Sequence, residues 1–319
     1  MRLDALIGAA HGAGRRLVLG GILPNALLLV TLAALIRAGA PGQRPALSDV
    51  ADQLRHAGIA QSLAVAAAAT VAALLLTPLQ LPLVRVLEGY WPDTGAIGRL
   101  KRRRCRSYAA RCADHRALTA PRSAPRPAEE RALIDRAVWR LRHRYPEDGG
   151  RIMPTRLGNI LRAAEDQAGG RYGLDTVTFW PRIYPLLPER LALLVDDARN
   201  QLDIAARFCA VFAFGALSTG ILLARHGSWW LLLPVALGTL SILAHRSALN
   251  AALLYGRVLQ TAFDLHRFDL RRALHLPLPP DLTMERAWNS ALSAFLAQGL
   301  DVAASYDHDP APDTPPSSP

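Results

Sequence analysis

Two apolar runs joined by a short turn constrain this chain more than any other feature. The runs cover residues 204–224 and 229–244, and the turn is Arg225-His226-Gly227-Ser228. A helix of about 20 apolar residues spans the ~30 Å hydrocarbon core of a bilayer. Helical periodicity extends from Pro188 into the first run and from the second run to Leu274. Residues 188–275 are therefore predicted to form a helical stalk and a transmembrane hairpin.

The helical stretches that precede the first apolar run and follow the second form two arms. Each arm carries one apolar stripe, with apolar residues spaced three or four positions apart. A helix of this kind buries its stripe against another helix. Since the turn is short, the two arms must run antiparallel, and their stripes are predicted to pack on each other. The stripes consist of Leu187, Leu191, Leu194, Ala198 and Leu202 in the first arm and Leu249, Leu253, Gly256, Phe263, Leu270 and Leu274 in the second.

A first transmembrane hairpin is predicted within residues 1–91, with spans at about 17–36 and 59–83. A secretory signal peptide is the alternative for the first run. That run is longer than the apolar segment of a signal peptide, and Pro41 directly follows the cleavage-like Ala38-Gly39-Ala40. An uncleaved span is therefore favoured.

The positive charge of the chain predicts its topology. The sequence has 37 Lys and Arg against 26 Asp and Glu, and a dense basic run follows the second predicted span. Basic residues collect on the cytoplasmic side of a membrane, so residues 84–203 and both termini are predicted to be cytoplasmic. The run also predicts a contact with anionic lipid, although it could serve topology alone. Its members are Lys101, Arg102, Arg103, Arg104 and Arg106. Nucleic acid is not expected, because no groove-reading motif accompanies the charge.

The remaining segments are predicted to form a cytosolic helical body. Residues 92–187 are its main domain and 276–305 its C-terminal helix, while 306–319 lack an apolar anchor and are predicted to be disordered. A proline-rich linker is expected at 119–127. Helices are expected at 128–145, 155–167 and 282–304, an extended β-like stretch at 174–180, and a proline-extended connection after it.

No catalytic, cofactor or metal signature is found. The P-loop, GxSxG, HExxH and GxGxxG patterns are missing from the sequence. Cys105, Cys112 and His115, with His143 as a fourth ligand, do not have the spacing of a zinc site. A charge-paired helix surface is the expected role of the remaining acidic cluster, Asp196, Asp197 and Asp203.

The densest mixture of charge, glycine and aromatic rings lies at residues 154–182. Two interpretations stay open: a loop-rich junction held by internal salt bridges, or a pocket for a ligand or partner near the membrane. The residues that would line it are Asn159, Glu165, Arg171, Tyr172, Asp175, Trp180 and Arg182.

Three stretches resemble a family of bacterial four-span membrane proteins to which no activity is assigned. They are TPLQLPLVRVLEGYW at 77–91, PTRLGNILRAAED with RYGLDTVTFWPR within 154–182, and AFDLHRFDLRRALHLPLP at 262–279. The resemblance implies a multi-pass protein of the bacterial cytoplasmic membrane with a shared cytosolic core. It transfers no catalytic residue.

The sequence thus predicts an all-α integral membrane protein with two transmembrane helical hairpins and a helical cytosolic domain. The spans carry no charge near their centres, which argues against a transporter. A non-enzymatic membrane-anchored scaffold or sensor is the favoured function. The alternative is an oligomeric channel or pore-forming effector, because uncharged polar residues in the spans could line a pore. A homo-oligomer is compatible with either function.

Overall fold

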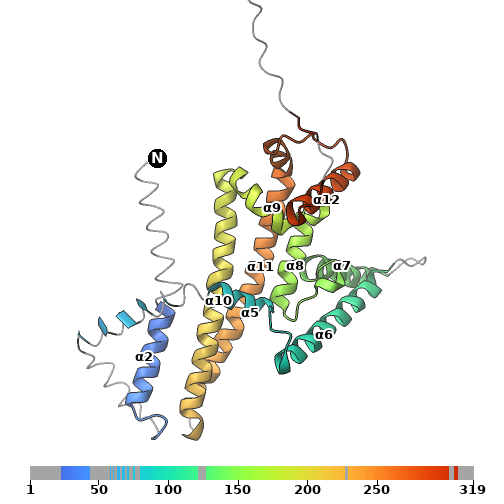
Figure 1. Cartoon of the computed structure of the whole chain (residues 1–319). Coiled ribbons are helices and arrows are strands. Elements are labelled where there is room, and N and C mark those ends of the chain that lie inside the picture. Colours follow the sequence, from blue (N-terminus) through green and yellow to red (C-terminus); the bar gives the residue numbers. More distant parts are fainter. Residues whose placement is uncertain are drawn as a thin grey trace, which may run out of the picture. The chain divides into compact units, whose positions relative to one another are not determined.

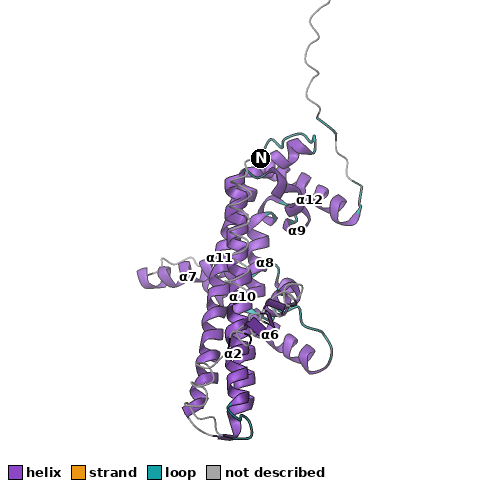
Figure 2. Cartoon of the chain, turned by 90° about the vertical axis from the view of Figure 1, so that its left-hand side faces the viewer, coloured by secondary structure: helices purple, strands orange, loops and turns teal. Residues whose placement is uncertain are grey.

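The structure, a computed structural model, describes residues 23–43, 58, 60, 63–64, 67–68, 70–71, 75, 80–120, 127–226, 229–301 and 305–307. Every regular element within these residues is helical (Figures 1 and 2), which confirms the all-α prediction. The α-helices are α2 (Leu23–Arg37), α5 (Gln80–Glu88), α6 (Gly95–Thr119), α7 (Ala128–Arg144), α8 (Arg156–Ala168), α9 (Thr176–Ile183), α10 (Glu189–Leu223), α11 (Leu232–Ala273) and α12 (Leu282–Gln298). Short 3₁₀ turns are η2 (Gly149–Arg151), η3 (Gly170–Tyr172), η4 (Tyr184–Leu186), η5 (Ala224–His226) and η6 (Trp229–Leu231).

The chain divides into two compact units. The hairpin unit comprises Met1–Trp91 and Asn200–Ala251, and the helical body comprises Pro92–Arg199 and Ala252–Pro319. The predicted linker at 119–127 and the predicted tail at 306–319 lie almost entirely outside the described residues.

The two longest helices agree with the predicted stalk segment. At 1.5 Å per residue, the 35 residues of α10 and the 42 residues of α11 extend about 50 Å and 60 Å. Helix α11 passes Arg246 without a break. Both helices are long and apolar enough to cross a membrane, and they are the two such helices in the described part of the chain.

The first predicted hairpin is not confirmed. Helix α2 is apolar but has 15 residues, which is short for a membrane span. The second predicted span, 59–83, lies mostly outside the described residues.

Within the hairpin unit, Gly215 of α10 marks a close approach of three helices. A Cβ atom at this glycine would lie 3.1 Å from Leu28 of α2 and 3.3 Å from Leu237 of α11. Toward the ends of α2 and α10, Leu35 and Leu223 share a buried cluster with Trp230. Since residue 28 lies near 215 and residue 35 near 223, α2 and α10 run parallel.

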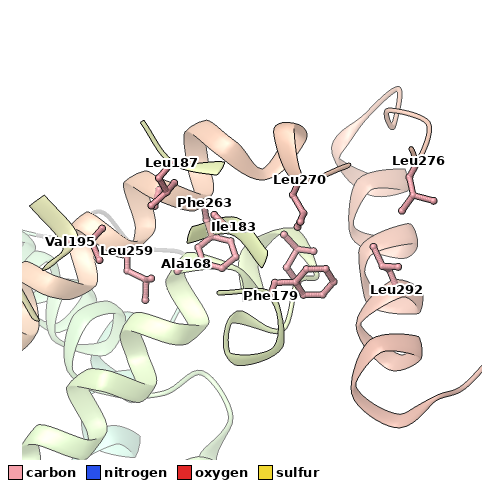
Figure 3. Close-up of a cluster of buried hydrophobic side chains, with 12 residues drawn as sticks. Ala168, Phe179, Ile183, Leu187, Val195, Leu259, Phe263, Leu270, Leu276 and Leu292 are labelled. Atoms are coloured by element: carbon pink, nitrogen blue, oxygen red, sulfur yellow. The ribbon is translucent and has the colours of Figure 1, made fainter. Parts of the chain in front are cut away.

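The helical body has one apolar core, shown in Figure 3. Phe179 and Ile183 of α9 lie beside Phe263 of α11, and both arms of the stalk contribute to the same cluster. The predicted stripe residues are buried or half-buried, with one correction: Leu194 is 58% exposed, whereas Val195 is buried. A helical stripe that contains residues 191, 198 and 202 of α10 passes through 195, because 194 lies about 100° to one side.

Three expectations for local structure are wrong. The β-like stretch at 174–180 is helix α9, and the proline-rich connection after it continues into η4. The Asp175 carboxylate accepts a hydrogen bond from the Thr178 amide at 3.0 Å and caps the helix. Helix α12 ends at Gln298 rather than 304, because Gly299 adopts φ +70° and closes it.

Candidate functional site

The seven predicted junction residues all lie in the helical body, but the structure separates them into three groups. Asn159 and Glu165 are on α8, whereas Arg171 and Tyr172 are in η3. The others are at α9: Asp175, Trp180 and Arg182. Each group has its own partners within the chain.

Asn159 holds the loop that enters α8. Its side chain is buried, and its Oδ1 accepts a hydrogen bond from the Met153 amide at 2.8 Å. Its Nδ2 donates to the carbonyls of Met153 and Thr155 at 2.9 and 2.8 Å. The amide thus satisfies backbone groups that would otherwise be buried without partners, and no polar atom of it points to a vacant site.

Glu165 belongs to a network of charges on the next turns of α8. Arg151 donates to Glu165 at 2.7 Å and also binds Asp166, while Arg162 donates to Glu165 at 2.8 Å. Asp166 in turn accepts from the Glu147 amide. The partners of Glu165 thus lie within the chain, as the interpretation of 154–182 as a junction held by internal salt bridges predicts.

Helix α12 recognises three consecutive backbone carbonyls of the η3 loop. Arg286 Nε donates to the carbonyl of Arg171 at 2.9 Å, and Asn289 Nδ2 donates to that of Tyr172 at 2.9 Å. The Ser293 hydroxyl donates to the carbonyl of residue 173 at 3.0 Å. The donors are three and four positions apart, so they share one face of α12. We call these six residues the α12 seat.

Gly173 allows the α12 seat to close. Its φ is +77°, and a Cβ atom there would lie 2.5 Å from the carbonyl oxygen of Arg286. A side chain is therefore disfavoured both by the backbone conformation and by the space. The η3 loop can approach α12 closely because residue 173 has no side chain.

The Tyr172 side chain connects the seat to α11. Its hydroxyl donates to Asp264 Oδ1 at 2.6 Å, and the Arg267 guanidinium lies 4.2 Å from the centre of its ring. Arg267 also pairs with the buried Glu285 of α12 at 2.8 Å. Partial burial, followed by the hydrogen bond to Asp264, raises the pKa of Tyr172, so the ring stays neutral at physiological pH.

A buried arginine completes the contact between α11 and α12. Arg271 is 5% exposed and donates to the carbonyl of Pro277 at 2.9 and 2.8 Å and to Asn289 Oδ1 at 2.9 Å. Burial lowers the pKa of its guanidinium, and the charge of Glu285 opposes this shift. The group remains charged and fixes Asn289 in the orientation that binds the loop.

The predicted residues at α9 either pack against the core or bind the backbone of α9 itself. Trp180 stacks on Phe263 with ring centres 6.2 Å apart, and Arg182 donates to the Thr178 carbonyl. The Asp175 carboxylate caps α9, while its backbone amide donates to Ser293 of α12. The 171–182 segment therefore binds the C-terminal helix of the same chain, and the occupant of the predicted junction is α12.

One sequence pattern could have predicted which residues lie next to the α12 seat. Asp264, Arg267 and Arg271 are three and four residues apart in the sequence, which places them on one face of a helix. Their contacts with η3 and α12 could not be read from that spacing.

The predicted lipid-contact residues lie on α6 and differ in their contacts. Lys101 pairs with Asp93 at 2.9 Å, and Arg102 donates to the Asp93 carbonyl at 3.1 Å. The three others are exposed: Arg103, Arg104 and Arg106. The free basic surface is therefore smaller than the sequence run.

The thiols next to this run face inward. Cys112 is buried, and the Cys105 thiol donates to the carbonyl of Ile152 at 3.4 Å. Burial raises the pKa of both thiols, which disfavours the reactive thiolate. Among the described residues, no three His, Cys, Asp or Glu side chains are grouped to hold a metal ion.

No protein-family model, curated protein or solved structure matches this chain. The resemblance to a four-span bacterial family therefore stays a prediction, and the functional conclusion depends on the geometry.

Proposed function

We propose that the protein is a non-enzymatic membrane-anchored scaffold or sensor, in which α10 and α11 cross the bilayer and carry the helical body. One observation supports this proposal above the others. In the most apolar stretches of α10 and α11, only 28% and 6% of the residues are buried. The core helix of a soluble protein buries such a stretch, whereas a membrane helix exposes it to lipid.

The exposed side chains in these stretches are large and apolar. On α10 they recur at three-four spacing, which aligns them along one side of the helix. At the turn, Trp229 and Trp230 stack with ring centres 4.4 Å apart, as expected for aromatic residues at a membrane interface. The exposed residues are Phe214, Leu217 and Ile221 on α10 and Leu232, Val235 and Ile242 on α11.

The parallel direction of α2 and α10 favours a four-span topology. If both cross the membrane in the same sense, the chain must return once between Arg37 and Glu189. The apolar run at 59–83 is the segment of suitable length and composition. We therefore propose two hairpins, with both termini and the basic helix α6 on the cytoplasmic side of a bacterial cytoplasmic membrane.

The hydroxyl groups in the proposed spans favour a scaffold over a pore. Thr31, Thr219 and Thr239 donate to the carbonyl four residues earlier in their own helix at 2.8, 2.6 and 2.9 Å. Ser241 donates to the carbonyl of Cys209 across the hairpin at 2.8 Å. These hydroxyls are satisfied within the helices, so they need no water-filled lumen.

Two measurements on the purified full-length chain test the proposal. The protein should resist extraction from membranes at alkaline pH, and planar bilayers that contain it should show no conductance above that of empty bilayers. Extraction as a peripheral protein would contradict the membrane anchor. Stepwise conductance would instead favour the channel function. The control is a Trp230→Ala variant: if its single-channel conductance equals that of the wild type, the current comes from a contaminating channel.

A further inference from the structure

Helix α7 presents a tryptophan on the side that faces away from the body. Ala137 is buried, and Trp139 is 40% exposed. Two residues correspond to about 200° around an α-helix, so the indole points away from the packed face. The indole is not part of the body core shown in Figure 3, and an exposed aromatic side chain is typical of a binding surface.

Basic side chains surround this indole. The Arg144 guanidinium lies 5.3 Å from the ring centre, and the His143 ring stacks on it at 5.0 Å. An open hollow around Trp139 is lined by Arg136, Arg140 and Arg144 together with Asp135. Three guanidinium groups against one carboxylate leave a net positive charge around an aromatic surface.

We propose that this surface, Trp139 with Arg136, Arg140 and Arg144, binds the anionic head groups of the bilayer. Guanidinium groups bind phosphate oxygens through paired hydrogen bonds, and an indole is favoured at the boundary between head groups and acyl chains. The inference rests on the proposed membrane anchor, and it adds a lipid contact on α7 that is separate from the basic run on α6.

A lipid surface fits the geometry better than a protein partner. A stable protein interface buries roughly 800 Å² on each side around a well-packed apolar centre. Here one helix offers a single indole ringed by flexible arginines, which can reach many head groups at once. Leu133 and Val138 are also exposed on α7, so the helix offers further apolar area to a lipid surface.

Photo-crosslinking in nanodiscs tests the proposal on the full-length chain. Trp139→p-benzoylphenylalanine places a crosslinker at the surface, and Phe295→p-benzoylphenylalanine is the matched control, because Phe295 of α12 is 42% exposed. We expect lipid adducts at position 139 in discs that contain phosphatidylglycerol, several times more than at 295, and few in discs of phosphatidylcholine alone. Mass spectrometry of the irradiated protein measures both yields.

Charge variants identify the groups that bind. Replacing Arg136, Arg140 and Arg144 with glutamine should lower the adduct yield at 139 by at least tenfold, since each charge near an anionic surface strengthens attachment several-fold and the three factors multiply. The control replaces Arg156, Arg190 and Arg272 with glutamine; these residues are exposed on other helices of the body, and their loss should leave the yield unchanged.

The outcomes separate this inference from the proposed function. Equal yields at 139 and 295, or adducts with a second protein chain instead of lipid, would overturn the lipid surface while alkaline-resistant anchoring persists. Loss of that anchoring would overturn the membrane proposal and this inference with it.

Discussion

Single residues decide how the body closes, and several of them act by having no side chain. Gly169 and Gly173 flank the η3 loop, and a Cβ atom on either would lie within 2.7 Å of neighbouring atoms. Gly256 of α11 is similar, because a Cβ there would lie 2.8 Å from that of Ala164 on α8. Helices and loops approach closely at these three positions, so a methyl group is sufficient to disturb the packing.

Gly173→Ala should destabilise the body by roughly 1–3 kcal/mol, from the positive φ and the contact with Arg286. Chemical unfolding of the detergent-solubilised protein measures the change. Gly149→Ala is the matched control, because a Cβ there meets no atom within 4 Å. Equal stability of the two variants would mean that α12 does not close on this loop.

Tyr172→Phe removes the hydrogen bond to Asp264 and should cost about 1 kcal/mol at neutral pH. Because the fold raises the Tyr172 pKa, its contribution is complete below the unfolded value of about 10 and is lost as pH rises through the folded pKa. The stability difference between wild type and variant should therefore shrink above pH ~10. A difference that is constant from pH 8 to 11, or one matched by the exposed Tyr306→Phe control, would contradict this.

At the scale of elements, α11 is the helix on which the body is assembled. One turn of it contacts α9 through Phe263, and the next turns carry Asp264, Arg267 and Arg271 toward η3 and α12. The same helix thus combines an apolar stripe with a polar one. The polar stripe selects how α12 docks, since each donor needs its acceptor.

Phe263→Ala should lower the free energy of unfolding by about 3–5 kcal/mol, because the ring is fully buried in the core. Leu253→Ala should cost less, since Leu253 is only half-buried. The exposed Leu265→Ala on the same helix should change stability by less than about 0.5 kcal/mol. If Phe263→Ala and Leu265→Ala unfold at the same denaturant concentration, the core is wrongly placed.

At the scale of the molecule, the proposed topology assigns each unit to a compartment. The basic helix α6 follows the second predicted span in the sequence, and the turn of the second hairpin follows α10. The native thiols are poor reporters, because Cys105 and Cys112 face inward. Exposed positions on α6 and on the hairpin turn are better suited.

Ser107→Cys should resist a membrane-impermeant thiol reagent added to intact cells and react after permeabilisation, because α6 is expected in the cytoplasm. Arg225→Cys at the hairpin turn should react without permeabilisation. Both residues are exposed in the structure, so access depends on the membrane. Labelling of residue 107 from outside would reverse the topology.

The sequence by itself determined the all-α class, the long helices α10 and α11 and part of their buried stripe, because apolar periodicity is a local property of the chain. It misassigned α9, whose Val, Thr and Phe residues favour strands. The Asp175 cap and the burial of Phe179 in the body core decide that segment. It also identified the polar residues of 154–182 without their partners. Only the tertiary structure showed that Arg286, Asn289 and Ser293 bind the η3 carbonyls, because contacts over more than 100 residues depend on how the helices pack and leave no periodic trace in the sequence.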